Sequence, residues 1–155
     1  MKNSLQNKAI SSFVKAVLYG VSGRLHFDRA SLGDILTLEN GDELVIFRKA
    51  VVDRRQNQPQ KPGAILQIRF QFARGTPKQN QTLSLIPIPF IVGLPGFRSK
   101  TWALHSASGG FQGTYEWDTV QDAEAYKKSF AIKLMTKRAV PQSLTFETVP
   151  QNGSS

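Results

Sequence analysis

The sequence contains no cysteine and only two histidines, His26 and His105. Disulfides, thiol catalysis and cysteine-based metal sites are therefore excluded, and two histidines are too few for an all-histidine metal site. No stretch approaches the ~18–20 consecutive apolar residues of a membrane-spanning helix. We expect no integral membrane segment, no bound metal and, because a cysteine-free chain suits a reducing compartment, a cytoplasmic protein.

Acidic residues are also scarce, since 11 Asp and Glu stand against 20 Lys and Arg, a formal net charge of +9. Such a balance is typical of nucleic-acid-binding proteins. The basic residues form no dense block, however, because residues 1–63 hold 10 basic and 6 acidic side chains and the remainder 10 and 5. We therefore expect the charge to favour solubility rather than nucleic-acid binding.

The composition divides the chain at the polar, proline-containing segment 56–63 (QNQPQKPG), which is typical of a linker or long loop. Eleven of the fifteen aromatic residues follow it, so the main core is predicted in residues 64–150. Residues 1–63 are then an N-terminal extension, and residues 151–155 a disordered tail.

The extension is predicted to contain one helix and one β-hairpin. Large apolar residues recur at spacings of three and four between residues 10 and 18, which indicates one face of a helix ending near Gly20 or Gly23. A targeting or membrane-surface role for this amphipathic segment is an alternative, but packing on the core is the simpler expectation. Asn40-Gly41 between residues 34–38 and 44–52 predicts the hairpin, because both residues tolerate the positive φ of its turn.

Residues 64–150 predict the order β-α-β-β-α-β, which is the ferredoxin-like arrangement of an antiparallel sheet with two helices on one face. Alternating apolar residues predict a strand over 64–74, and a short helix limited by two prolines falls within 79–93. A helix is also predicted from Thr119, with Ala123, Tyr126, Phe130 and Leu134 as its buried stripe. The other three predicted strands are 97–106, 111–118 and 143–149.

In each of the two predicted central strands, aromatic or basic residues occupy every second position and therefore lie on one face of the strand. Arg98, Lys100 and Trp102 fall on one parity of residues 97–106, and Tyr115 and Trp117 on one parity of residues 111–118. These side chains suit a pocket for a flat or anionic organic molecule, although core or interface packing explains aromatic residues equally well. Gly113, inside the second of these strands, is typical of a close approach by a ligand or backbone.

Titratable residues give no catalytic motif. His105 ends a predicted strand and is a candidate general base, with a surface position in a hairpin as the alternative. His26 is a weaker candidate, and the carboxylates are explained by helix capping and cross-strand pairing. The sequence holds no phosphate-binding loop and no dinucleotide-binding glycine motif.

The runs LPGFRSKTW and GGFQGTYEW, followed by a helix with Ala123, Ala125 and Tyr126, resemble the dimeric α+β barrel superfamily. Within it, the likeness is to monooxygenase-like proteins related to antibiotic-biosynthesis monooxygenases, and it covers residues 64–150. The resemblance implies a homodimer whose two sheets pack into a shared barrel, with a pocket between sheet and helices in each protomer. Some members oxidise electron-rich aromatic molecules with O2 and no cofactor, whereas others have different activities, so fold alone does not fix function.

The resemblance implies a cofactor-independent, monooxygenase-like enzyme that acts on a small aromatic or enolisable molecule with O2 as co-substrate. Such a site excludes water, orients the ring and stabilises the substrate anion. The candidate catalytic residues are His105 and Tyr115, and the candidate substrate-binding residues are Arg98, Lys100, Trp102, Trp117 and Phe90.

Two alternatives are a non-catalytic small-molecule-binding protein on the same fold and an RNA-binding RRM module, which has the same order of elements. The RRM signature is not met by GGFQGTYEW, so we expect no nucleic-acid partner.

Overall fold

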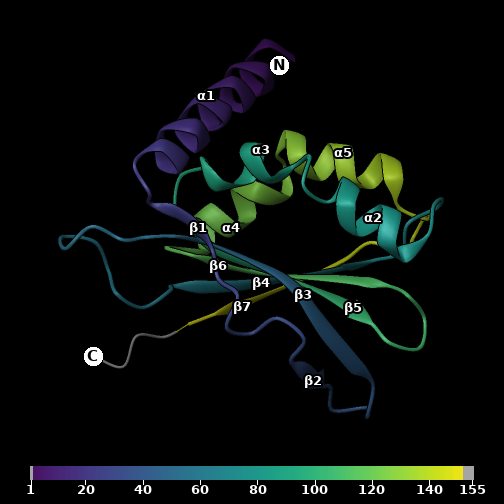
Figure 1. Ribbon diagram of the computed structural model, residues 1–155. Coiled ribbons are helices and arrows are strands. Elements are labelled where there is room, and N and C mark those ends of the chain that lie inside the picture. The colour runs from purple at the N-terminus through teal and green to yellow at the C-terminus, as the bar shows by residue number, and fades with distance from the viewer. Residues whose placement is uncertain (1, 152–155) are drawn as a thin grey trace.

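One twisted antiparallel sheet carries the fold, and the helices lie on one of its faces (Figure 1). The computed structural model describes residues 2–151, within which seven strands pair in the order β1-β3-β5-β6-β4-β7, with β2 also paired to β3. The strands are β1 Leu25–Phe27, β2 Ile35–Thr37, β3 Glu43–Val52, β4 Ala64–Phe70, β5 Phe97–His105, β6 Phe111–Trp117 and β7 Thr145–Pro150. The helices are α1 Lys2–Val21, α2 Pro77–Leu83, α3 Ile88–Val92, α4 Val120–Lys127 and α5 Phe130–Arg138. None of them is long and apolar enough to cross a membrane.

The ferredoxin-like arrangement is confirmed, because β5-β6-β4-β7 form the four-stranded unit with helical segments after β4 and β6. Strand β4 buries every second residue, as the alternation predicts. Leu66 pairs with Tyr115 and Ile68 with Gly113, which places the apolar side chains of β4 beneath the helices. The extension continues this sheet, since β3 pairs with β5.

The single helix predicted from Thr119 is in fact two helices. Ser129 interrupts it, and its hydroxyl caps α5 by accepting from the backbone N–H of Ile132 at 3.3 Å. The break changes which residues face the core, so Phe130 is 40% exposed whereas Ile132 and Met135 are buried. The predicted buried stripe was therefore wrong at Phe130, whereas Leu134 is half-buried and faces the sheet side of α5 that covers the inner cavity.

The helix predicted within 79–93 is likewise divided into α2 and α3. A capping box at Thr76 and Gln79 begins α2, and Pro87 separates the two helices because it cannot donate the backbone hydrogen bond that a continuous helix requires. The hairpin around Asn40-Gly41 is confirmed as β2–β3, with a φ of 85° at Gly41. Strand β1 was not predicted, and residues 152–155 of the predicted tail lie outside the described residues.

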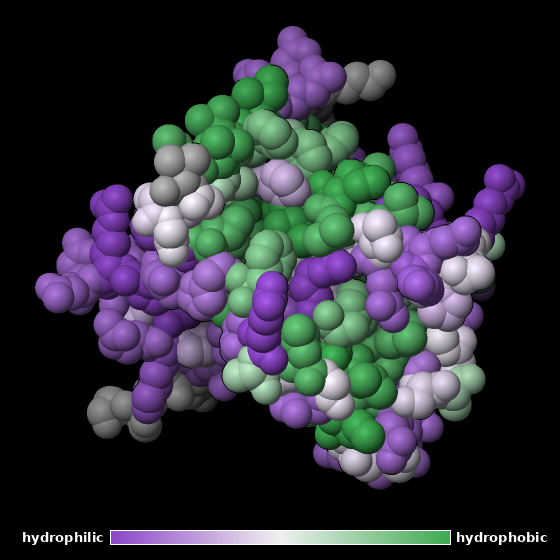
Figure 2. Space-filling view, in the orientation of Figure 1, coloured by the Kyte–Doolittle hydropathy of each residue, from purple (hydrophilic) through white to green (hydrophobic). Residues whose placement is uncertain are grey.

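Helix α1 forms as predicted, but it docks through a different face. Its large apolar side chains point to solvent (Figure 2), with exposed fractions of 46–63% at Ile10, Phe13, Val14, Val17 and Leu18. The helix instead packs through Ser12 and Ala16, which are buried against α3. The reason is close packing: a Cβ at Gly93 would collide with the Ser12 backbone, so only small residues fit at this contact.

Candidate functional site

A buried lysine lies between two aromatic rings on the helix-facing side of the sheet. Lys100 of β5 pairs directly with Tyr115 of β6, and Trp102 is its neighbour on the same face of β5. The Lys100 side chain is 2% exposed, and its Nζ is 4.3 Å from the Trp102 ring centroid and 4.5 Å from that of Tyr115. No carboxylate pairs with it among residues 2–151.

Burial lowers the pKa of the Lys100 amine well below its ordinary value, and the positive charge of Arg48 lowers it further. A neutral amine is both a proton acceptor and a nucleophile, which a protonated lysine is not. The direction of the shift favours the neutral amine, which makes Lys100 the candidate base of this site.

Arg48 of β3 supplies the fixed positive charge of the site. It pairs directly with Trp102 across β3 and β5, and its guanidinium carbon is 5.7 Å from the Trp102 ring centroid. The guanidinium donates to the Ser84 hydroxyl and, at 3.1 Å, to the carbonyl of Gln81. These bonds hold Arg48 at the Trp102 ring, close enough for its charge to act on Lys100, while Arg138 is the arginine that lines the inner cavity itself.

Gly113 makes room for this arrangement. A Cβ at Gly113 would lie 2.7 Å from Tyr115 Cε2 and 3.2 Å from Lys100 Cε. The close approach that the sequence indicates at Gly113 is therefore made by the protein's own side chains.

Tyr115 is tied to the helical layer through Tyr126 of α4, whose hydroxyl donates to the Tyr115 hydroxyl at 3.1 Å. Both rings are buried, and burial raises the pKa of each phenol above its ordinary value. Tyr115 is consequently a neutral hydrogen-bonding group near Lys100 rather than a phenolate base.

The inner cavity beside Lys100 is small, with a volume of about 30 Å³, which is room for one water-sized molecule. Strands β4, β5 and β6 form its floor, and α5 and the segment between α2 and α3 cover it. Its lining includes Phe70, Ser84, Lys100, Trp102, Tyr115 and Arg138.

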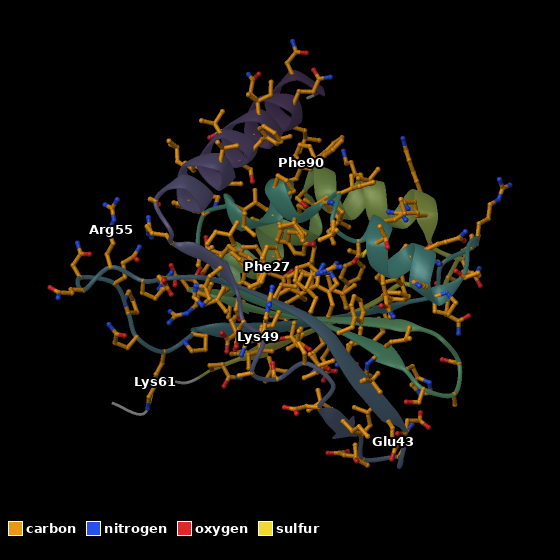
Figure 3. The ribbon with its side chains drawn as sticks, in the orientation of Figure 1. Phe27, Glu43, Lys49, Arg55, Lys61 and Phe90 are labelled. Atoms are coloured by element: carbon orange, nitrogen blue, oxygen red, sulfur yellow. The ribbon has the colours of Figure 1, made fainter. Side chains whose placement is uncertain are left out.

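Three of the predicted site residues, Lys100, Trp102 and Tyr115, meet at this cavity, but Arg98 does not. A register shift between Phe97 and Ser99 turns Arg98 toward the loop before β4. Its guanidinium donates to Asp118 and to the carbonyls of residues 59–61, so it anchors the loop that carries Arg55 and Lys61 (Figure 3).

His105 lies away from Lys100, on the opposite parity of β5. Its Nε2 is 3.1 Å from the Asp42 carboxylate, its Nδ1 contacts the Ser108 hydroxyl, and it lines a separate open groove of about 360 Å³. His26 lies at the sheet edge, 3.5 Å from Asp53.

Trp117 and Phe90 line a second cavity beneath α1 rather than the inner cavity. Figure 3 shows Phe90 in the helical layer, close to α1. The predicted binding residues thus divide between two places in the fold.

Arg48 and Arg138 were missed by the sequence reasoning. Arg48 belongs to the predicted hairpin strand 44–52, where it shares the parity of the buried Ala50 and Val52. A charged residue on the apolar parity of a strand is the signal that could have identified it. Arg138 ends α5 and stacks 5.0 Å over Phe72, and nothing in its sequence context distinguishes it from the nearby surface lysines.

The inner cavity does not fit a haem group. Neither histidine lines it, and about 30 Å³ is far too small for a macrocycle. Residues 2–151 also contain no group of three or more His, Asp or Glu side chains that could hold a metal ion.

No protein-family model and no curated protein matches the chain. Solved structures do match it, among them a heme-degrading enzyme from Listeria monocytogenes, at 14% identity over 72% of each chain and a TM-score of 0.53. A ferredoxin-fold protein related to antibiotic biosynthesis monooxygenases from the same organism matches at 14% identity, 76% and 69% coverage and a TM-score of 0.53. A monooxygenase-like protein from Listeria innocua matches with the same identity and coverage and a TM-score of 0.51. The chain therefore has the ferredoxin-like α+β fold of the monooxygenase-like proteins that its sequence resembles.

Proposed function

We propose that the protein is a monooxygenase-like enzyme that uses Lys100 to deprotonate a small aromatic or enolisable substrate, with O2 as co-substrate and no metal or organic cofactor. The observation that carries the proposal is the buried Lys100 amine, which lies between two aromatic rings beside a fixed guanidinium. The fold supports the class of protein, and the site supports the chemistry.

In the proposed reaction, Lys100 Nζ accepts a proton from an acidic methylene carbon of the substrate. The resulting enolate is stabilised by Arg48, and the indole of Trp102 orients its ring. The anion then gives electrons to O2, so that one oxygen atom forms the new carbonyl and the other leaves as water with the two substrate hydrogens. The substrate is oxidised by two electron pairs, which O2 accepts, and the amine is regenerated.

The size of the inner cavity sets a condition on this mechanism. A volume of about 30 Å³ admits O2 or water but not an aromatic ring. The substrate must therefore displace part of the cover, which Ser84, Pro87 and Arg138 form. Movement of the short α2–α3 segment is the simplest way to open it.

The small cavity favours a second candidate, a non-catalytic small-molecule-binding protein. In this candidate Lys100 is a buried core residue without a catalytic role, and ligands bind elsewhere. The two candidates differ in one result, since only the enzyme consumes O2 in a reaction that depends on the Lys100 amine.

The experiment is to incubate the protein with 1,8-dihydroxyanthrone, an enolisable phenolic probe, in a chelator-containing buffer and to follow O2 uptake with an electrode. We expect turnover above the spontaneous rate, with one O2 consumed per quinone formed. Lys100→Met should reduce the rate to the background, because it removes the base and keeps the side-chain volume. Lys133→Met, at an exposed position on α5, is the matched control and should keep the full rate. Equal rates for both variants would refute the proposal.

We also propose that the protein is a homodimer, as the resemblance implies. Within residues 2–151, no helix covers the sheet face opposite the helical layer (Figure 1), and Val149 on β7 is 39% exposed there. A second copy laid on this face would bury it. Light scattering at micromolar concentration should give twice the mass of the chain, and a monomer would contradict the dimer.

A further inference from the structure

A second and larger cavity lies between α1 and the layer of α3, α4 and α5. Its volume is about 330 Å³, which falls in the range of small-molecule sites. Its walls are mainly apolar and aromatic, with Phe90, Trp117, Tyr126 and Phe130 contributing rings. A flat aromatic body suits such walls better than a flexible chain does.

The wall includes a buried hydrogen-bond donor with no acceptor. Trp117 is fully buried, and its Nε1–H has no partner within the described part of the chain. Buried indole N–H groups are normally bonded, because leaving a donor unpaired in the interior is costly. Trp117 lines the cavity, and a ligand oxygen that displaces the side chains covering the indole would be the missing acceptor.

Positive charge surrounds the same cavity. Lys8 and Lys15 of α1 and Lys128 after α4 line it, and all three are exposed. The one carboxylate in the lining, that of Asp122, already accepts from the Thr119 hydroxyl at 2.7 Å. The balance at the cavity therefore favours an anion.

We propose that this cavity is a second binding site, which takes an aromatic carboxylate: the ring packs against Phe90 and Trp117, an oxygen accepts from the Trp117 N–H, and the lysines neutralise the charge. The site exists only because α1 is docked. One wall of the site, α1, therefore belongs to the part of the chain that the monooxygenase resemblance does not cover, whereas Phe90 and Trp117 belong to the part that it covers. Binding at this site does not depend on turnover at Lys100.

The contact that holds α1 gives a specific means of removing the site. Ser12 Oγ donates to the carbonyl of Pro89 at 3.1 Å, and Gly93 lies directly against the Ser12 backbone. The Phe13 ring packs 6.0 Å from that of Phe90. Gly93→Ala would push α1 away from this surface, whereas the sheet and the inner cavity make no use of Gly93.

The experiment is a titration of ¹⁵N-labelled protein with 2-naphthoate, followed by NMR. The chain has two tryptophans, so two indole N–H signals are expected, and Trp102→Phe identifies that of Trp117. We expect a saturable shift of the Trp117 signal with 2-naphthoate and a much weaker one with neutral 2-naphthamide. Lys8→Gln, Lys15→Gln and Lys128→Gln together should raise Kd about tenfold, because three partly screened charges are lost.

The matched control replaces three exposed lysines outside the cavity, Lys78, Lys133 and Lys137, by glutamine, and it should leave Kd unchanged. Gly93→Ala should abolish the shift, and Lys100→Met should preserve it, which separates this site from the proposed enzyme activity. A static Trp117 signal at millimolar 2-naphthoate would overturn the proposal. NMR shifts confined to the outer apolar face of α1 would also overturn it. An equal loss of affinity in the cavity lysine variant and in the control lysine variant would do the same.

Discussion

The Lys100 amine lies 4.3 Å from the centroid of the Trp102 ring, in a position where no carboxylate within residues 2–151 pairs with it. The electron-rich face of an indole attracts a cation, but it cannot replace the hydration that a fully buried ammonium loses. Burial therefore prevails and favours the neutral amine. A buried amine without a carboxylate partner lowers folding stability, which makes the arrangement testable by equilibrium unfolding.

Lys100→Met should stabilise the protein at pH 7. Because the pKa of Lys100 is lower in the folded than in the unfolded chain, the unfolded state binds more protons between the two pKa values. The free energy of unfolding of the parent protein thus rises with pH in this interval, and the cost of Lys100 disappears as pH passes its ordinary pKa of ~10.4. Urea unfolding between pH 7 and pH 10 measures this effect. The difference in the free energy of unfolding between Lys100→Met and the parent protein should decrease as the pH rises.

Lys133→Met is the control for this series, because its parent side chain is exposed. Its unfolding free energy should follow that of the parent protein at every pH. A stability difference for Lys100→Met that stays constant across the range would show that the lysine remains charged in the folded protein.

Gly113→Ala should destabilise the protein by ~1–3 kcal/mol, because the added Cβ overlaps the Tyr115 ring and crowds the Lys100 stem. Thermal and urea unfolding measure the loss. Gly20→Ala in α1, where a Cβ meets no atom within 4 Å, should instead stabilise by about 0.5 kcal/mol through helix propensity. Equal effects at both glycines would contradict the crowding at Gly113.

Arg98→Ala should cost about 3 kcal/mol of stability, since it leaves Asp118 with one cation fewer and three loop carbonyls without their donor. O2 consumption per folded molecule should not change, because Arg98 does not line the inner cavity. Arg98→Lys should recover part of the stability. If Arg98→Ala lost turnover without losing stability, the result would indicate that Arg98 does contact the substrate.

The hydrogen bond between Tyr126 and Tyr115 should give a coupling energy of about 1 kcal/mol in a double-mutant cycle with Phe at both positions. Each single variant leaves a buried hydroxyl unpaired and should be less stable than the parent protein. The double variant removes both hydroxyls and should be more stable than the two single losses predict. Additive losses would indicate that the two hydroxyls do not bond in solution.

The order of strands and helices in residues 64–150 could be predicted because local signals were strong. The alternation of β4 determines a strand within a few residues, and in the extension the turn at Asn40-Gly41 determines the hairpin in the same way. The helix boundaries at Ser129 and Pro87 were harder, since a capping serine inside an apolar pattern does not by itself end a helix. One missed boundary was enough to misplace Phe130.

The composition of the site depended on tertiary structure. Lys100, Trp102 and Tyr115 share a face by simple alternation, which the sequence predicts. Arg98 lies outside the site because of one register shift between β5 and β6. Arg48 lies next to Trp102 because β3 pairs with β5. Neither long-range pairing has a local signal. Tyr115 and Trp117 are buried in the core rather than on the open face of the sheet, the face on which RRM modules stack bases.

The pairing of β3 with β5 has a consequence for how the chain can be divided. Seven residue pairs join these strands, from Leu44–His105 to Val51–Ser99. A protein beginning at residue 64 would expose the backbone N–H and C=O groups of β5 as an open sheet edge beside the buried Lys100. Open edges recruit strands from other molecules, so such a fragment is expected to self-associate. The segment that lacks family resemblance thus protects the segment that has it from aggregation.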